Sequence, residues 1–401
     1  LPGAVSLLAV GTAYEENTVP ATVTVTRAST ATNAALTVNY SPGGTASNGP
    51  DYQLLPGWIT LPETVATTQL VIRPYWDGLI EGDETVRVTL ASGAYVIGAA
   101  STADVTIVDP FLVQGANTNL NAGVWGAGGT WSLGRQPIAG DDVVIAASIT
   151  NNQPVPPAGA LASLTVNAGR TLTFSGWNSG LTATVVTVYG TITHLPQSVT
   201  VTNVAGEWLP DHRLWLACSN LTVATNGSID VTGKGYGSGA FTNGYGPGGA
   251  IAVAHTGYGG GYGGIGSGGP GKGGITYGSI TAPVDPGSGG SAWNEMPGGA
   301  GGGIIRIQAD GCVTVNGTIA SDGTVGGTYG GGGAGGSVYV TCRTFAGSNG
   351  TVSANGRLPS QSGGGGGGRV AVVFDPGAQS NQNQIARPLV RFSANQGFTG
   401  L

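Results

Sequence analysis

A repeated two-part motif between residues 214 and 374 constrains the fold more than any other feature of this chain. The first part is a short run in which apolar residues alternate with others. Four copies follow a glycine, at Gly249, Gly303, Gly336 and Gly368, and an opening copy without the glycine begins at Leu214. The second part is Asn-Gly, then a hydroxyl residue and a β-branched residue, at Asn226, Asn316 and Asn349. Repeats of this length, with period-two alternation and no helical period, predict the stacked coils of a right-handed parallel β-helix. The Asn-Gly pairs predict turns that need a positive φ.

The copies of the first part align residue by residue. The alignment places Leu214, Leu216 and Cys218 beside Ile305, Ile307 and Ala309, then beside Val338, Val340 and Cys342, then beside Val370, Val372 and Phe374. Because alternate residues of a strand point to opposite faces, we expect these sets to point inward and stack as a core. The glycine runs then fall at one corner of every coil and should project together as a glycine-rich lobe.

The longest glycine-rich stretch, 233–303, contains regularly placed tyrosines and Trp293. Flexible linkers lack regular aromatic residues, which disfavours a simple linker. Between Gly259 and Ile275 the non-glycine residues recur every second or third position. This spacing favours extended, polyproline-II-like chains packed side by side, at contacts that only glycine fits. The alternative is a lobe of irregular loops.

The composition is that of a folded, strand-rich chain, because only 8% of the 401 residues are charged and 40% are hydrophobic. No apolar run approaches the ~20 residues of a membrane helix, so we expect no membrane insertion. The net charge of -6 argues against nucleic acid as a partner. The chain begins Leu1-Pro2-Gly3 without a basic segment, so we expect an extracellular protein of the bacterial cell surface whose signal peptide has been removed.

Residues 1–110 form an acidic module, with ten acidic and three basic residues. Strand-like runs separated by turn residues predict an antiparallel, immunoglobulin-like sandwich. The expected strands are 5–10, 21–27, 35–40, 67–74, 85–91 and 103–108.

Two motifs of this module are specific. Gly44-Thr45-Ala46 is followed by Asp51-Tyr52, and Asp77 opens the acidic run Asp77-Gly78-Leu79-Ile80-Glu81-Gly82-Asp83-Glu84. In these motifs the module resembles the Calx-beta family. The resemblance implies a sandwich that binds Ca²⁺ at one end, with ligands at Glu16, Asp51, Asp77, Glu81 and Asp109. Carboxylate oxygens are ligands that Ca²⁺ prefers. The alternative is a solvated acidic rim on a purely structural domain.

We expect four segments in all: a sandwich (1–110), a cap and linker containing Trp125 and Trp131 (111–161), a β-helix (162–374) with a glycine-rich insertion (233–303), and a tail (375–401). Of the three cysteines, Cys218 and Cys342 should face inward, at least two coils apart. That separation is too great for a disulfide, since rungs lie ~4.8 Å apart. The alternative is that the outward Cys312 links chains.

No arrangement of residues predicts catalysis. The histidines are scattered, and the best acid pair on the solenoid is Glu207 and Asp211 near Arg213, which is more simply a turn hydrogen-bonded to that arginine. We therefore expect no enzyme but a calcium-stabilised structural subunit of an extracellular bacterial filament or adhesive appendage. The alternative is a polysaccharide-binding module or polysaccharide-active enzyme that contacts surface glycans, its tyrosines and tryptophans stacking on sugar rings.

The tail carries one apolar patch, Leu389, Val390 and Phe392. The last rung of a β-helix is an unpaired edge that must be capped or paired. We expect the patch to pair with the sheet of a second copy, which would build a head-to-tail polymer. The alternative is that the tail folds back and caps its own coil.

Overall fold

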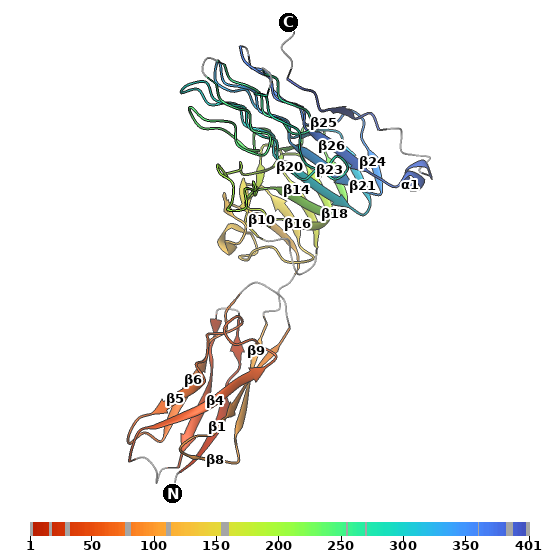
Figure 1. Cartoon of the computed structure of the whole chain (residues 1–401). Coiled ribbons are helices and arrows are strands. Elements are labelled where there is room, and N and C mark those ends of the chain that lie inside the picture. Colours follow the sequence, from red (N-terminus) through yellow and green to blue (C-terminus); the bar gives the residue numbers. More distant parts are fainter. Residues whose placement is uncertain are drawn as a thin grey trace. The chain divides into compact units, whose positions relative to one another are not determined.

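The structure is a computed structural model that describes residues 3–15, 18–28, 33–76, 82–109, 114–153, 160–253, 256–268, 271–359, 361–381 and 388–397. The chain divides into two compact units, Leu1–Val113 and Gln114–Leu401 (Figure 1). Both are built from strands. Helix α1 (Pro376–Asn381) has six residues, and nothing helical in the described part of the chain has the length and apolarity of a membrane span.

The first unit is a sandwich of two sheets, with strand orders β6-β3-β1-β8 and β2-β9-β7-β4-β5. The strands are β1 (Ala4–Val10), β2 (Ala13–Tyr14), β3 (Ala21–Arg27), β4 (Leu36–Gly44), β5 (Trp58–Leu61), β6 (Thr67–Ile72), β7 (Glu84–Leu90), β8 (Val96–Ile97) and β9 (Thr102–Val108). Alternation explains their burial: on β3, Ala21, Val23 and Val25 lie in the core, and the threonines between them are half-buried. All six predicted strands are present, with ends that differ by a few residues.

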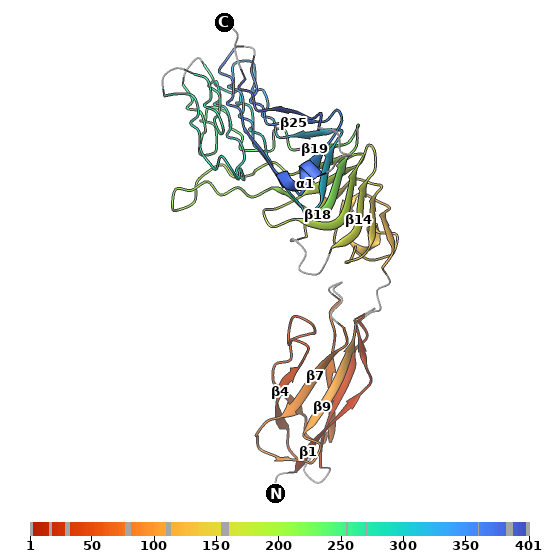
Figure 2. The same cartoon turned by 90° about the vertical axis from the view of Figure 1, so that its right-hand side faces the viewer.

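The second unit is a solenoid whose coils add strands to two parallel sheets (Figure 2). The first solenoid sheet contains β10 (Ala116–Asn119), β12 (Asp142–Ile145), β14 (Leu161–Val166), β16 (Leu181–Val188), β18 (Leu214–Val223), β20 (Ile304–Ala309), β23 (Ser337–Thr341) and β26 (Arg369–Val373), with β21 (Cys312–Val315) and β24 (Thr344–Ala346) alongside. The second solenoid sheet contains β11 (Gly123–Val124), β13 (Ile149–Asn151), β15 (Thr171–Phe174), β17 (Thr191–His194), β19 (Ser228–Asp230), β22 (Thr318–Ala320), β25 (Thr351–Ser353) and β27 (Arg391–Ser393). The all-β class with long parallel sheets is therefore confirmed. The coils begin at Ala116, so starting the solenoid at residue 162 was wrong.

The core ladder has the predicted register. Leu214 lies opposite Ile305, Ile305 opposite Val338, and Val338 opposite Val370. The inward residues of the inner coils are buried in one continuous cluster, because each coil covers the next. Phe374 does not belong to this core: it lies beyond the end of β26 and is 42% exposed. The cysteines are free thiols, with Cys218 and Cys342 buried as predicted.

The Asn-Gly turns also stack as predicted, with Ile229 opposite Ile319 and Ile319 opposite Val352. Their glycines are needed for a different reason than the sequence suggested. Gly227, Gly317 and Gly350 do not have positive φ. A Cβ on any of them would come within 3.0 Å of a carbonyl oxygen of the preceding coil. The turn therefore demands glycine because two backbones approach closely.

The first end of the solenoid is capped. Thr130 and Ser132 bond to the backbone of β10 and of the residue after it. Ser132 N donates to Thr118 O at 2.8 Å, and Leu120 N donates to Thr130 O at 2.7 Å. The buried rings of Trp125 and Trp131 meet edge to face, 4.9 Å between centroids, over the start of the core. The predicted capping role of this segment agrees with these contacts, which cover both the strand edge and the apolar interior.

The tail is not a free strand. Its residues form β27, which pairs in parallel with β25 of the same chain, with Phe392 opposite Val352. The predicted donation of Leu389, Val390 and Phe392 to another copy is therefore wrong in this structure, and the tail supplies the last rung of its own second sheet. Gln379 of α1 adds a small cap, since its side-chain amide bonds to both the N and the O of Phe345 on β24.

The glycine-rich segments form one packed lobe beside the solenoid, seen in both views as ribbons without arrows (Figures 1 and 2). Each chain of the lobe bonds to several neighbours, with a three-residue period. The segment 331–336 shows this period. The amides of Gly331 and Ala334 donate to the carbonyls of Ser291 and Ser288 on one neighbouring chain, and those of Gly332 and Gly335 donate to Gly363 and Gly366 on a second. The amides of Gly333 and Gly336 donate to Thr324 and Ser321 on a third. Three residues per turn is the repeat of a polyproline-II chain. The packed bundle is therefore confirmed over irregular loops. The copy of the motif at Gly249 belongs to this lobe, so its assignment as a strand was wrong.

Candidate calcium site and the polar sites of the solenoid

One end of the sandwich gathers acidic side chains because of its strand register. Glu15 follows β2, Asp109 follows β9, and Glu84 opens β7. Tyr14 of β2 lies opposite Val108 of β9, and Glu84 lies opposite Ile107 of the same strand. The ends of these three strands therefore meet. Asp109 also closes the loop before β7, as its Oδ2 accepts a hydrogen bond of 2.7 Å from Gly82 N.

Asp51 reaches the same end from the connection between β4 and β5. Its Oδ2 accepts a 2.5 Å hydrogen bond from Ser47 N, and its carbonyl accepts one of 2.8 Å from Tyr75 N. The connection is tied to the start of β7 through Ala46 N and Thr85 O, 3.1 Å apart. The structure thus brings Asp51 and Asp109, two of the five expected ligands, to one end of the sandwich.

Glu16, Asp77 and Glu81 lie outside the described residues. Within the residues that are described, no group of three or more His, Cys, Asp or Glu side chains is close enough to hold a metal ion. The donor set nonetheless has the right chemistry, because carboxylate oxygens suit Ca²⁺ and a carboxylate that accepts one backbone amide retains further lone pairs. The resemblance overlooked Glu15 and Glu84. Their signal is positional, since each directly adjoins a strand that ends at this edge.

Residues 3–111 match the family model of the Calx-beta domain. The match covers the sandwich and no part of the solenoid. Among solved structures, the apo form of the Calx CBD1 domain is 23% identical, with a TM-score of 0.24, and the similarity covers 27% of this chain and 99% of that one. The calcium binding domain CBD12 of CALX1.1 is also 23% identical, with a TM-score of 0.24, over 29% of this chain and 49% of that chain. No curated protein matches the chain.

The acid pair expected on the solenoid is not a pair. Asp211 accepts a 3.1 Å hydrogen bond from Ser198 N and lies 2.9 Å from His212 Nδ1, whereas Glu207 Oε2 accepts one from Asn203 Nδ2 at 3.1 Å. Arg213 does not hold either turn, because its Nε donates to the carbonyl of Trp177 at 2.6 Å. The expected link to Arg213 was therefore wrong, and both acids serve separate turns.

The aromatic residues of the lobe contact one another. Tyr262 and Tyr277 lie 4.8 Å apart between ring centroids, and Trp293 and Tyr329 lie 4.6 Å apart. The hydroxyl of Tyr262 bonds to Ser337 Oγ at 2.8 Å, and burial raises the pKa of Tyr262 to about 12. These rings tie the lobe together and, through Tyr262, to β23.

His194, at the end of β17, links the second solenoid sheet to the start of β20 in the first solenoid sheet. Its Nδ1 lies 2.6 Å from Leu195 O and its Nε2 lies 3.0 Å from Ile304 N. A carbonyl can only accept and an amide can only donate, so Nδ1 carries the proton and Nε2 accepts. Burial lowers the pKa of His194 to about 4. This histidine is therefore a neutral structural bridge in the interior.

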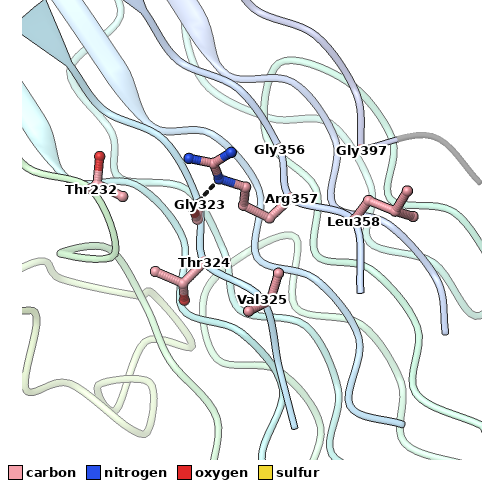
Figure 3. Close-up of a pocket in the computed structure, with 8 residues that line it drawn as sticks. All are labelled: Thr232, Gly323, Thr324, Val325, Gly356, Arg357, Leu358 and Gly397. Atoms are coloured by element: carbon pink, nitrogen blue, oxygen red, sulfur yellow. Dashed lines mark hydrogen bonds between the residues drawn. The ribbon is translucent and has the colours of Figure 1, made fainter. Parts of the chain in front are cut away.

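The corners of four successive coils line a groove of about 520 Å³ (Figure 3). Its residues are Thr232, Gly323, Thr324, Val325, Gly356, Arg357, Leu358 and Gly397. Arg357 is the charged member. Its Nε donates to Gly323 O at 3.3 Å, and its NH2 lies 3.5 Å from Asp322 Oδ2. Because that charge is matched by Asp322 and the other lining groups are small or apolar, the groove offers little chemistry of its own.

Proposed function

We propose that this chain is a structural subunit of an extracellular filament or adhesive surface appendage, which joins other copies through its last coil and is stiffened by Ca²⁺ in the sandwich. The observation that carries the proposal is the difference between the two ends of the solenoid. The first end is covered by Thr130–Ser132 and a tryptophan pair. The last end is an apolar surface.

The last coil exposes residues that are buried in every inner coil. Val370 and Val372 occupy core positions but are only partly buried. Beside them Val373 is 50% exposed, Phe392 is 51% exposed and Leu389 is 67% exposed. Among the described strands, β26 pairs only with β23 and β27 only with β25, so the outer edge of each has no partner strand in the described part of the chain. Such an edge with apolar neighbours is suited to pairing with another chain.

The packing of the lobe also favours a structural role over polysaccharide binding by its aromatic residues. Sugar rings stack on open aromatic faces, whereas Tyr262, Tyr277, Trp293 and Tyr329 lie against one another. A regular bundle of glycine chains suits a rigid part of an assembly.

The test is concentration-dependent assembly, followed by sedimentation velocity and negative-stain microscopy. Val373→Asp and Phe392→Asp place charges on the last coil at positions that are already half exposed, so the fold should survive while assembly is lost. Val201→Asp is the matched control, since Val201 is 71% exposed in the connection between β17 and β18, several coils before the last one. Wild-type protein that remains monomeric at high concentration, with or without Ca²⁺, would refute the proposal. Equal assembly of all three variants would show that the last coil is not the contact.

A further inference from the structure

The outer face of the first solenoid sheet carries a stack of alternating tryptophan and arginine side chains. Leu214 and Leu216 point into the core, so Trp215 between them points outward, opposite Arg306 on β20. The guanidinium carbons of Arg213 and Arg306 each lie 4.7 Å from the ring centroid of Trp215. Arg213 is also 4.5 Å from the ring of Trp177. The stack therefore crosses successive coils of the solenoid.

The side chains of this stack are fixed in place. Arg213 Nε donates to Trp177 O at 2.6 Å, and Trp215 Nε1 donates to Gln308 Oε1 at 2.8 Å. The contacts of both guanidinium groups with the indole add cation–π attraction to these bonds. The two guanidinium groups are thereby held within about twice 4.7 Å of each other, along the direction in which the coils stack.

No carboxylate of the described residues forms an ion pair with either cation. The arginines that do form ion pairs with a carboxylate are Arg87, Arg135 and Arg357. The Nε of Arg306 is buried without a hydrogen-bond partner, an arrangement that costs free energy. Burial, and then the charge of Arg306, lower the pKa of Arg213. Two like charges thus lie close together on one face, with donors left over.

We propose that this face binds the carboxylate groups of an acidic polysaccharide lying across the coils, with Arg213 and Arg306 as the anion-binding residues. A guanidinium presents parallel N–H donors that match the two oxygens of a carboxylate. Gln308 and Tyr339, on the same outer face as Arg306, add neutral hydrogen-bonding groups suited to sugar hydroxyls.

Nucleic acid fits this face less well. Two guanidinium groups already lie over the Trp215 ring, so a base would have to displace one of them to stack there. The net charge of -6 also opposes a densely charged polyphosphate, whereas two cations among neutral donors suit a chain with fewer charges and many hydroxyls. The proposal concerns the folded single chain and does not depend on assembly.

The experiment measures binding of the full chain to polygalacturonate by calorimetry, with neutral dextran and duplex DNA as the other probes. Arg306→Gln and Arg213→Gln should each weaken binding to polygalacturonate by about tenfold or more, since each change removes charge-assisted hydrogen bonds to a carboxylate. Arg343→Gln, at an exposed arginine outside the stack, should leave it unchanged. Trp215→Leu, which keeps both charges but removes the plane that orders them, should weaken binding less than either arginine change.

Arg306→Lys separates loss of binding from loss of folding, because it keeps the charge but loses the two parallel N–H donors of the guanidinium. It should bind polygalacturonate more weakly than wild type and have an unchanged melting curve. Binding that survives both glutamine changes would overturn the proposal. Equal affinity for dextran, or tighter binding to DNA with the same loss on mutation, would overturn it as well.

Discussion

Acid should weaken the contact that His194 makes between the two solenoid sheets. The pKa of this buried histidine is about 4, against 6.5 for an unperturbed histidine. The unfolded chain therefore takes up a proton near pH 6.5, whereas the folded chain resists protonation until about pH 4. The contribution of neutral His194 to the free energy of unfolding is fully present above about pH 6.5 and is lost progressively as the pH drops toward 4. The full shift corresponds to about 3 kcal/mol.

The loss should also be local, because an opening that exposes His194 lets Nε2 take up a proton, after which it can no longer accept from Ile304 N. We expect hydrogen exchange at the Ile304 amide, corrected for its intrinsic pH dependence, to lose protection between pH 6.5 and 4.5. The free energy of unfolding of the second unit should fall by about 2–3 kcal/mol over that range. Denaturant melts followed by tryptophan fluorescence, with exchange resolved by mass spectrometry, measure both quantities.

The control is His194→Gln, whose side-chain oxygen can accept from the same amide but does not titrate. This variant should be less stable at pH 7.5, yet its stability should change little between pH 6.5 and 4.5. If wild type and variant lose stability in parallel, carboxylates elsewhere cause the acid sensitivity, and the assignment of His194 as a neutral bridge is refuted.

Three further predictions concern the lobe, the sandwich and the first coil. Gly332→Ala and Gly365→Val should destabilise the second unit by about 1–3 kcal/mol or more, because the new Cβ would come within 3.0 Å of a carbonyl oxygen. Gly237→Ala is the control and should not destabilise it, because nothing lies within 4 Å of a Cβ there. Equal melting temperatures for all three variants would contradict the close packing of the lobe. Ca²⁺ should raise the melting temperature of the sandwich, and Asp51→Asn or Asp109→Asn should abolish that increase. Asp104→Asn, which changes an exposed ion pair with Arg87, should preserve it. A melting curve that does not respond to chelation would rule the calcium site out. Arg135→Ala should cost about 3–5 kcal/mol, because it leaves the buried Asp141 without its partner 2.6 Å away, while Arg87→Ala should change stability little in the same urea titration.

The register of the solenoid was predictable because its signal lies in side chains. Leu214, Ile305 and Val338 must point inward, and a shift of one residue would expose all of them. Alternation does not show what covers a strand, however. The run after Gly249 has the same pattern, but it lies in the lobe, where Ile251 N bonds to Lys272 O.

The arrangement within the lobe could not be predicted, because glycine carries no side chain to indicate its neighbours. The three-residue spacing implied packed extended chains, but nothing in it pairs Gly332 with Gly363. The candidate calcium site was predictable only in part, through acids placed at strand ends. The stack around Trp215 could not be predicted, because Trp177 and Arg306 lie 38 and 91 residues from Trp215 along the chain. These residues meet only when the coils stack.

The lobe also has a mechanical consequence. Gly363 and Gly366 donate to Gly257 and Gly260 across the bundle. Gly363 and Gly366 lie in the segment that follows β25, and Gly257 and Gly260 lie in the segment that follows β19. In the second solenoid sheet β22 lies between β19 and β25. A pull along the stacking direction would therefore strain the strand ladder and the glycine bundle together, since two coils that do not touch in the sheet are tied outside it. The bundle would thus distribute an applied force over the hydrogen bonds of several coils, and the strand pairing of one coil would not have to break first.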